Sequence, residues 1–283
     1  MSNPLPLLAQ RVFNTPLAIH PAKAEIIISA LADRLGISRI HAPAMQFDDD
    51  SFSRSKNNGG YEITPDGVAI IQIYGTLVQK LGTLKPYSGM TGYDGIRQNF
   101  ITALLDPAVK AIMLDVSSPG GEVSGCFDLV DEIYSARGDK PIWAVLDDAA
   151  YSAAYALASA ADVITVPRTG GTGSIGVIWM HVDWSKALAS NGLNVSILTF
   201  GDKKADGHPE IPLSDEARAR FQSDIDAMGQ LFADTVARNR GITSSAVVAT
   251  QAGTYLGKSG VDAGLADSVL APDEAYRELI ATL

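Results

Sequence analysis

The sequence predicts an α/β protein built on a parallel β-sheet. Short apolar runs alternate with segments of helical periodicity, and the runs are apolar throughout rather than at every second position. Such strands are buried on both faces, as in parallel sheets that helices cover. Glycine-rich turns follow several of the runs. Because loops at the carboxyl ends of strands build the site in open α/β sheets, we expect the functional residues in these turns.

The composition narrows the class of protein. Of its 283 residues, 46% are hydrophobic and 19% charged, as in soluble globular proteins. The net charge of −10 disfavours a nucleic-acid partner. Cys126 is the single cysteine, so neither an intramolecular disulfide nor a cysteine metal cluster is expected, and no cofactor is predicted. Neither a signal peptide nor a membrane-spanning run is found, so no membrane partner is expected.

Two regions are expected to precede the main domain, which is assigned to residues 61–283. Residues 1–46 are predicted to form a helical appendage, with an amphipathic helix near residues 22–35. Residues 47–60 are polar and end in two glycines, which predicts a flexible linker. The apolar residues of the appendage helix are Ile26, Ile27, Leu31 and Leu35.

The main domain is predicted to alternate strands and helices. Gly75 is expected to end the first strand, and glycine-rich turns fall at residues 117–121 and 169–177. The predicted strands are residues 68–73, 110–116, 141–146, 163–166 and 195–200. The predicted helices between them are residues 93–105, 122–136, 153–161 and 183–190.

The last third of the chain is predicted to be helical. Ser214 is a typical helix start and Gly241 a typical residue after a helix end, so a long helix is expected between them. Shorter helices are expected near residues 244–251 and after Pro272. One face of the long helix is apolar and packs either on the sheet or against another subunit. This face comprises Phe221, Ile225, Met228, Leu231, Phe232 and Val236.

Ser152 lies between a predicted strand and an alanine-rich helix. The first N–H groups of such a helix lack intrahelical partners, so a serine there can be a simple N-cap. It can also be a nucleophile, because a helix N-terminus favours negative charge and the N–H of Ala153 can donate to an oxyanion. The residues of this turn alone leave both interpretations open.

A serine nucleophile requires a base, and two kinds are present. His181 offers a Ser-His arrangement, whereas His20 and His41 lie in the appendage and are expected to be structural. Lys203 and Lys204 offer a lysine base, since burial or neighbouring dipoles can favour a neutral amine.

Four motifs in this order resemble the signal peptide peptidase A family, and most of all its phage branch, the prohead (minor capsid) proteases. The resemblance covers residues 68–264 and implies the fold shared by Clp proteases and crotonases, with a Ser-Lys dyad. The motifs are Asp115-Val116-Ser117-Ser118-Pro119-Gly120-Gly121, Ala150-Tyr151-Ser152-Ala153-Ala154-Tyr155, Gly173-Ser174-Ile175-Gly176-Val177 and Gly201-x-x-Lys204-x-x-Gly207-x-Pro209.

The resemblance implies a role for each matching residue. Lys204 rather than Lys203 falls on the general base, because only Lys204 stands three residues after Gly201. The other implied roles are nucleophile for Ser152, orienting serine of the lysine for Ser174, oxyanion N–H donors for Gly121 and Ala153, and substrate binding for Gly120.

The function that the resemblance implies is a serine endopeptidase that cleaves scaffold and other head proteins during phage capsid maturation. It would act in the host cytoplasm, within assembling proheads, as a homo-oligomeric ring. Two alternatives stay open. A crotonase-like acyl-CoA enzyme would use the same fold and oxyanion hole without a nucleophile, and a capsid assembly protein would use the fold for oligomerisation alone.

Overall fold

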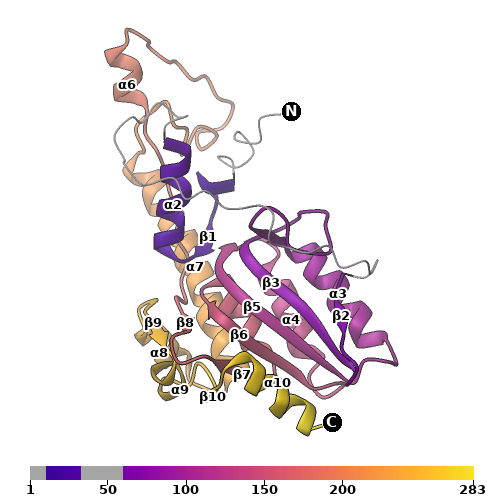
Figure 1. The fold of residues 1–283 in the computed structure, drawn as a ribbon. Coiled ribbons are helices and arrows are strands. Elements are labelled where there is room, and N and C mark those ends of the chain that lie inside the picture. The colour runs from indigo at the N-terminus through magenta and orange to yellow at the C-terminus, as the bar shows by residue number, and fades with distance from the viewer. Residues whose placement is uncertain (1–10, 33–59) are drawn as a thin grey trace.

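The computed structural model describes residues 11–32 and 60–283. Its centre is a mostly parallel sheet with the strand order β10-β7-β6-β5-β3-β2 (Figure 1). The long strands are β3 (Val68–Val78), β5 (Ala111–Glu122) and β6 (Ile142–Ala150), which pair in parallel. The prediction of an α/β protein with a largely parallel sheet is confirmed, while its assignment to the Clp/crotonase fold stays a prediction.

Shorter strands and the helices complete the described chain. The shorter strands are β1 (Leu17–Ile19), β2 (Glu62–Ile63), β4 (Met90–Gly92), β7 (Val163–Val166), β8 (Gly171–Gly173), β9 (Thr254–Leu256) and β10 (Ser268–Val269). The helices are α2 (Pro21–Ala32), α3 (Tyr93–Leu105), α4 (Cys126–Ser135), α5 (Ala153–Ser159), α6 (Ser185–Ser190), α7 (Asp215–Arg240), α8 (Ser244–Ala249), α9 (Lys258–Asp262) and α10 (Pro272–Ala281). Within the described ranges, none of these helices combines the length and apolar character needed to cross a bilayer.

Helices cover the two faces of the sheet unequally. On one face α3, α4 and α5 enclose the main core, which includes the fully buried Ile71, Leu114 and Tyr155 (Figure 1). On the other face α10 packs Leu279 against Trp143 at one end of the strands. The predicted cover on both faces therefore holds for only part of the second face.

The uncovered part of the second face carries a half-buried carboxyl group. The phenol of Tyr74 on β3 donates a hydrogen bond to Asp115 on β5. Burial raises the pKa of Asp115 to about 6, although the Tyr74 hydrogen bond lowers it; the nearby charge of Asp147 raises it further. Asp115 thus binds its proton more tightly in the folded chain than in an unfolded one.

One guanidinium group joins the C-terminal ends of two helices. Arg137 donates to the carbonyl oxygens of Ser159 at 2.9 Å, Ala160 at 2.8 Å and Ala161 at 2.6 Å. It also donates to the carbonyl of Asn239, in the last turn of α7, at 3.1 Å. Carbonyl groups at helix ends lack intrahelical partners, so this single cation satisfies the ends of both α5 and α7.

Strands β3 and β5 run further than predicted. β3 continues past Gly75, where φ is +66° and the register shifts in a bulge. β5 continues through the predicted turn to Glu122, and the next helix begins at Cys126 instead of residue 122. β5 stays a strand through the predicted turn because it pairs there on two sides, with β3 and with the N-terminal strand β1.

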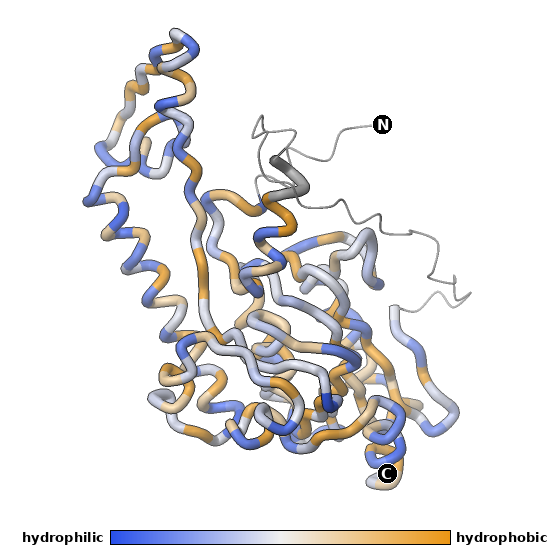
Figure 2. Tube along the Cα trace, turned by 60° about the vertical axis from the view of Figure 1, so that its left-hand side comes forward, coloured by the Kyte–Doolittle hydropathy of each residue, from blue (hydrophilic) through white to orange (hydrophobic). Residues whose placement is uncertain are grey.

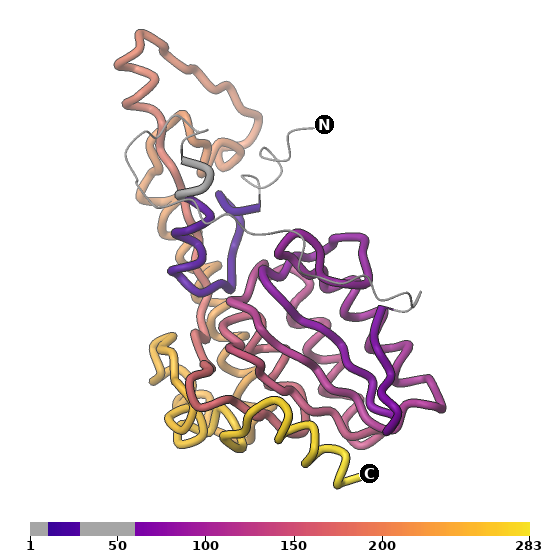
Figure 3. The backbone as a smooth tube through the Cα atoms, viewed as in Figure 1, coloured from indigo at the N-terminus to yellow at the C-terminus, as the bar shows by residue number. Residues whose placement is uncertain are grey.

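The strand predicted at residues 195–200 is wrong. This segment belongs to residues 179–213, here called the arm, which extends beyond the sheet and has α6 near its tip (Figures 1 and 3). Leu198 and Phe200 are 97% and 104% exposed. An apolar run forms a strand only where a neighbour satisfies its backbone, and no described strand pairs with this one.

Helix α7 agrees with its predicted start and end. The hydroxyl of Ser214 accepts a 3.1 Å hydrogen bond from the Ala217 N–H, and Gly241 ends the helix with φ +65°. Phe232 and Val236 are buried in the core. The first half of α7 instead leaves the sheet and runs toward the arm, with polar and apolar residues alternating along it (Figure 2).

The N-terminal helix lies near its predicted position, at α2. Ile27 packs with Leu17 and Ile19, but Ile26 is 51% exposed, so the docking face differs from the predicted one. The side chains of Leu31 and Leu35 lie outside the described residues, as do most of the predicted linker and the rest of the appendage. The division at residues 46 and 60 therefore stays a prediction.

Candidate active site

Three segments meet at the carboxyl ends of β5 and β6. The end of β5 meets the β6–α5 turn, where the N–H of Tyr151 donates to the carbonyl of Ser118 at 3.0 Å. The N–H of Ser152 donates to the carbonyl of Gly173, at the end of β8, at 2.9 Å. The structure thus brings together three of the four motifs.

Ser152 has a strained backbone. Its φ of 55° and ψ of −121° lie in a region that costs a non-glycine residue on the order of 1–3 kcal/mol and is typical of functional sites. Its side chain is buried and does not cap α5. The hydroxyl instead donates to the carbonyl of Gly176 at 3.3 Å. The simple N-cap interpretation therefore does not describe this serine.

Two glycines let the end of β5 approach Ser152. Gly120 has φ +97°, and a Cβ added there would lie 3.0 Å from the Cβ of Ser152 and would clash with the carbonyl oxygen of Ala18. A Cβ on Gly121 would overlap the carbonyl oxygen of Leu77 on β3. Only glycine fits both positions, and Gly120 lies against the Ser152 side chain.

Ser174 lies in the segment that holds Ser152. It is buried, its φ is 54°, and its N–H donates to the carbonyl of Gly253 at 2.8 Å. The segment from Gly173 to Gly176 is thus bonded to Ser152 on one side and to Gly253 on the other. Both serines singled out by the sequence therefore sit in strained, buried backbone at one place.

Tyr151 adds a neutral hydroxyl beside the site. Burial raises the pKa of its phenol, and the carboxylate of Asp148 raises it further. Its ring lies against the imidazole of His20, with 4.9 Å between the ring centroids.

Lys204 is not brought to Ser152 within one chain. It lies in an exposed turn of the arm, where its N–H donates to the carbonyl of Gly201 at 3.1 Å. Among the described residues its ammonium group has neither a hydrogen bond nor an ion pair. A general base must come within about 2.6–3.2 Å of the proton that it takes. The single folded chain therefore presents Ser152 without the predicted base.

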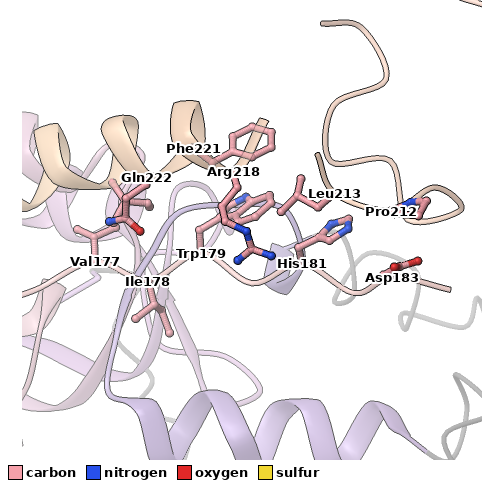
Figure 4. Close-up of a pocket in the computed structure, with 11 residues that line it drawn as sticks. Val177, Ile178, Trp179, His181, Asp183, Pro212, Leu213, Arg218, Phe221 and Gln222 are labelled. Carbon is pink, nitrogen blue, oxygen red and sulfur yellow. The ribbon is translucent and has the colours of Figure 1, made fainter. Parts of the chain in front are cut away.

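His181 also lies apart from Ser152. Its ring stacks on Trp179 with 5.6 Å between centroids, and its Nδ1 lies 3.2 Å from the Oδ1 of Asn14. Both rings line a cavity of about 640 Å³ between the arm and α7, together with Arg218 and Phe221 (Figure 4). The Ser-His alternative therefore has no direct contact to support it among the described residues.

Sequence comparison identifies the relatives of this chain. The profile of Peptidase family S49 matches residues 135–282. The chain belongs to peptidase family S49. This assignment confirms the resemblance to signal peptide peptidase A that the motifs indicated. One similar protein is the chloroplastic serine protease SPPA of Arabidopsis thaliana, which is 27% identical over 86% of this chain and 36% of that protein.

Two phage proteins are similar to this chain over nearly its whole length. The capsid assembly protease C of Escherichia phage lambda is 38% identical over 96% of this chain and 64% of its own length. The head-tail preconnector protein GP5 of Enterobacteria phage P21 is 37% identical over 96% of this chain and 56% of its own length. The predicted resemblance to the phage branch is confirmed, and the chain spans about three fifths of these relatives.

Sequence reasoning missed two components of the site. Strand β1 lies against residues 120–122, but no strand was predicted in the N-terminal region. The available signal was the short apolar run Leu17-Ala18-Ile19 after Pro16, which is too short for periodicity to be informative. The carbonyl of Gly176 as the partner of the Ser152 hydroxyl was also not predicted.

Proposed function

We propose that this protein is a serine endopeptidase of phage capsid maturation, with Ser152 as its nucleophile. The observation that carries the proposal is the strained, buried Ser152 at a strand-to-helix turn against Gly120. It is supported by membership of a peptidase family and by the likeness to a phage capsid assembly protease. The substrates are scaffold and other head proteins, cut inside assembling proheads in the host cytoplasm.

The proposed chemistry uses two side chains as nucleophile and base and two backbone groups as oxyanion donors. The Ser152 oxygen attacks the scissile carbonyl while its proton passes to the Lys204 amine, which Ser174 orients. The N–H groups of Gly121 and Ala153 donate to the oxyanion that forms. The protonated lysine then gives its proton to the leaving amine, and water hydrolyses the acyl-enzyme with the lysine again as base.

Assembly supplies the base in this proposal. Lys204 is exposed on an arm that extends away from its own sheet, so the arm of one copy reaches the Ser152 of the next copy in a homo-oligomeric ring. The exposed Leu198 and Phe200 on the same arm are apolar groups that such a contact would bury. The Clp/crotonase-like fold and the domain division at residues 46 and 60 belong to the same proposal.

A serine-reactive fluorophosphonate probe tests the nucleophile. The assembled wild-type protein should be labelled on Ser152, as shown by mass spectrometry of the modified peptide, and Ser152→Ala should not be labelled. Ser223→Ala, on the exposed surface of α7, is the matched control and should label as the wild type does. Labelling absent from a protein that still supports particle maturation would instead favour a capsid assembly protein without catalysis.

A further inference from the structure

A strand from the N-terminal region of the chain lies across the candidate active site. β1 pairs antiparallel with the end of β5, and its register places Ala18 opposite Gly121. Hydrogen bonds flank this pair on both sides. The N–H of His20 donates to the carbonyl of Pro119 at 2.8 Å, and the N–H of Val123 donates to that of Pro16 at 3.4 Å.

The other edge of β1 is bonded as well. Leu17 and Ile178 exchange two hydrogen bonds, of 2.9 Å and 2.8 Å. The N–H of Asn14 donates to the carbonyl of Met180 at 3.0 Å. The segment therefore fills a groove between residues 120–122 and residues 176–180, here called the β1 groove. Both walls of the β1 groove adjoin Ser152, one through Gly120 and the other through the Gly176 carbonyl.

The register directs the carbonyl of Ala18 toward the proposed oxyanion donor. Opposite residues of an antiparallel pair alternate between hydrogen-bonded and non-bonded pairs. The two flanking bonds each lie two residues from Ala18, so Ala18 and Gly121 form a bonded pair. The Gly121 N–H, the oxyanion donor of the proposed mechanism, thus faces the Ala18 carbonyl. The same oxygen lies so close to Gly120 that a Cβ there would meet both it and Ser152.

We propose that the β1 groove is the peptide-binding groove and that β1 fills it in the resting chain as a built-in substrate mimic. This inference rests on the proposed function. A protein substrate would enter as an extended strand, bonded on both edges, and would displace β1. Ala18 is fully buried, so the residue on the acyl side of the cleaved bond must be small.

The mimic is short, and two of its three side chains pack outside the main core, as a displaceable strand requires. β1 has three residues, all buried; Leu17 and Ile19 pack in a small cluster separate from the main core, whereas Ala18 packs in the main core. The Arg11 guanidinium lies 2.7 Å from the Glu122 carboxylate, with 38% of the Arg11 side chain exposed.

Peptide binding to the inactive full-length chain tests the proposal without chemistry. The probe is a fluorescent peptide with the sequence Thr15-Pro16-Leu17-Ala18-Ile19-His20, added to Ser152→Ala and followed by anisotropy. Adding Leu17→Asp places a charge in the contact that holds β1, so the groove opens and the apparent affinity rises by about tenfold or more. Leu105→Asp, at an exposed position of α3, is the matched control and should leave the affinity unchanged. The proposal would be overturned by equal affinity of the peptide for Ser152→Ala with and without Leu17→Asp, or by no binding to either of these two proteins when both are folded.

A second measurement covers the case in which Leu17→Asp does not fold. Amide hydrogen exchange of residues 17–20 in Ser152→Ala should accelerate when the peptide is saturating, because bound peptide releases β1. Saturable binding with unchanged exchange at these residues would overturn the displacement. Neither readout depends on Ser152 as a nucleophile, so a failure of fluorophosphonate labelling would count against the proposed function and leave this result standing.

Discussion

The hydroxyl of Ser152 is bonded to the carbonyl oxygen of Gly176 at 3.3 Å. This contact directs the side chain toward the segment that leads into the arm. In the proposed mechanism the lysine must take the place of this carbonyl as the acceptor of the hydroxyl proton. The resting chain is therefore ordered around the proposed nucleophile but not yet arranged for proton transfer.

The strain at Ser152 can be measured directly. Ser152→Ala keeps a Cβ in the unfavourable backbone region, whereas Ser152→Gly relieves the strain. Both variants should lose cleavage by roughly 10⁴-fold or more, since groups that act as one unit fail together. Ser152→Gly should nevertheless be more stable than Ser152→Ala, by about 1 kcal/mol in urea unfolding. Equal unfolding free energies would show that the backbone of this turn is unstrained.

Mixing two inactive variants tests the supply of Lys204 by a neighbouring copy. Ser152→Ala and Lys204→Ala should each be inactive alone. When the two are assembled together in equal amounts, some sites combine an intact serine with an intact lysine, and roughly a quarter of the wild-type activity should return. A peptide-cleavage assay on refolded mixtures measures this recovery.

Lys203→Ala provides the control for that experiment and should keep most activity, alone or mixed. Mixtures that stay inactive although both variants fold and assemble would place the two residues of each dyad in one chain. Full activity of Lys204→Ala alone would remove this lysine from the mechanism.

His181→Ala separates a lysine base from a histidine base. The His181 ring contacts Trp179 and Asn14, so its removal should loosen the arm and leave kcat within about threefold of the wild type. Complete loss of kcat in a folded, assembled variant would support the Ser-His alternative. Steady-state kinetics with analytical ultracentrifugation distinguish loss of chemistry from loss of assembly.

Gly121→Ala should be severely disruptive. The added Cβ overlaps the carbonyl of Leu77, which belongs to a central strand and cannot move without breaking the pairing of β3 with β5. We expect Gly121→Ala to lower the free energy of unfolding by about 3 kcal/mol or more and to abolish cleavage. Gly229→Ala is the matched control, because a Cβ there meets nothing within 4 Å and alanine favours the helix. Thermal unfolding compares the two variants, and similar melting temperatures would contradict the prediction.

Asp115 should give the fold a pH dependence of unusual sign. Its pKa is raised by burial to about 6 from 3.8, so the folded state holds a proton that the unfolded state has lost. This contribution is fully present below pH 4 and is lost as the pH rises through 6. It amounts to on the order of 3 kcal/mol. Asp115→Asn cannot titrate, so it should not lose this stability as the pH rises. The difference in unfolding free energy between the variant and the wild type should therefore change between about pH 4 and pH 6. Parallel curves for the two proteins would contradict the assignment.

The elements with local signals were predicted well. Ser214 and Gly241 marked both ends of α7, and α3 matched its prediction because its apolar positions follow a helical period. Gly120 and Gly121 were expected in a turn, yet they lie in a strand. Which neighbours β5 pairs with depends on β1, about a hundred residues earlier in the chain, and no local pattern contains that information.

The candidate site was predicted in part for the same reason. Ser152, Ser174 and Gly121 lie at the ends of neighbouring strands, so strand order alone brings them together. Lys204 follows an apolar run that was expected to be a strand of the sheet and instead lies in the arm. In the proposed ring its position relative to Ser152 depends on contacts with a neighbouring copy, which a motif cannot specify.

The shared cap formed by Arg137 has a mechanical consequence. One guanidinium binds the last carbonyls of α5 and the last turn of α7, so it links the ends of the two helices. The first turn of α5 directly follows Ser152, and the free half of α7 points toward the arm. A displacement of α7 by a neighbouring copy would therefore be transmitted through Arg137 to the backbone of the serine. Ring closure and the alignment of the nucleophile would then be a single motion rather than two successive events.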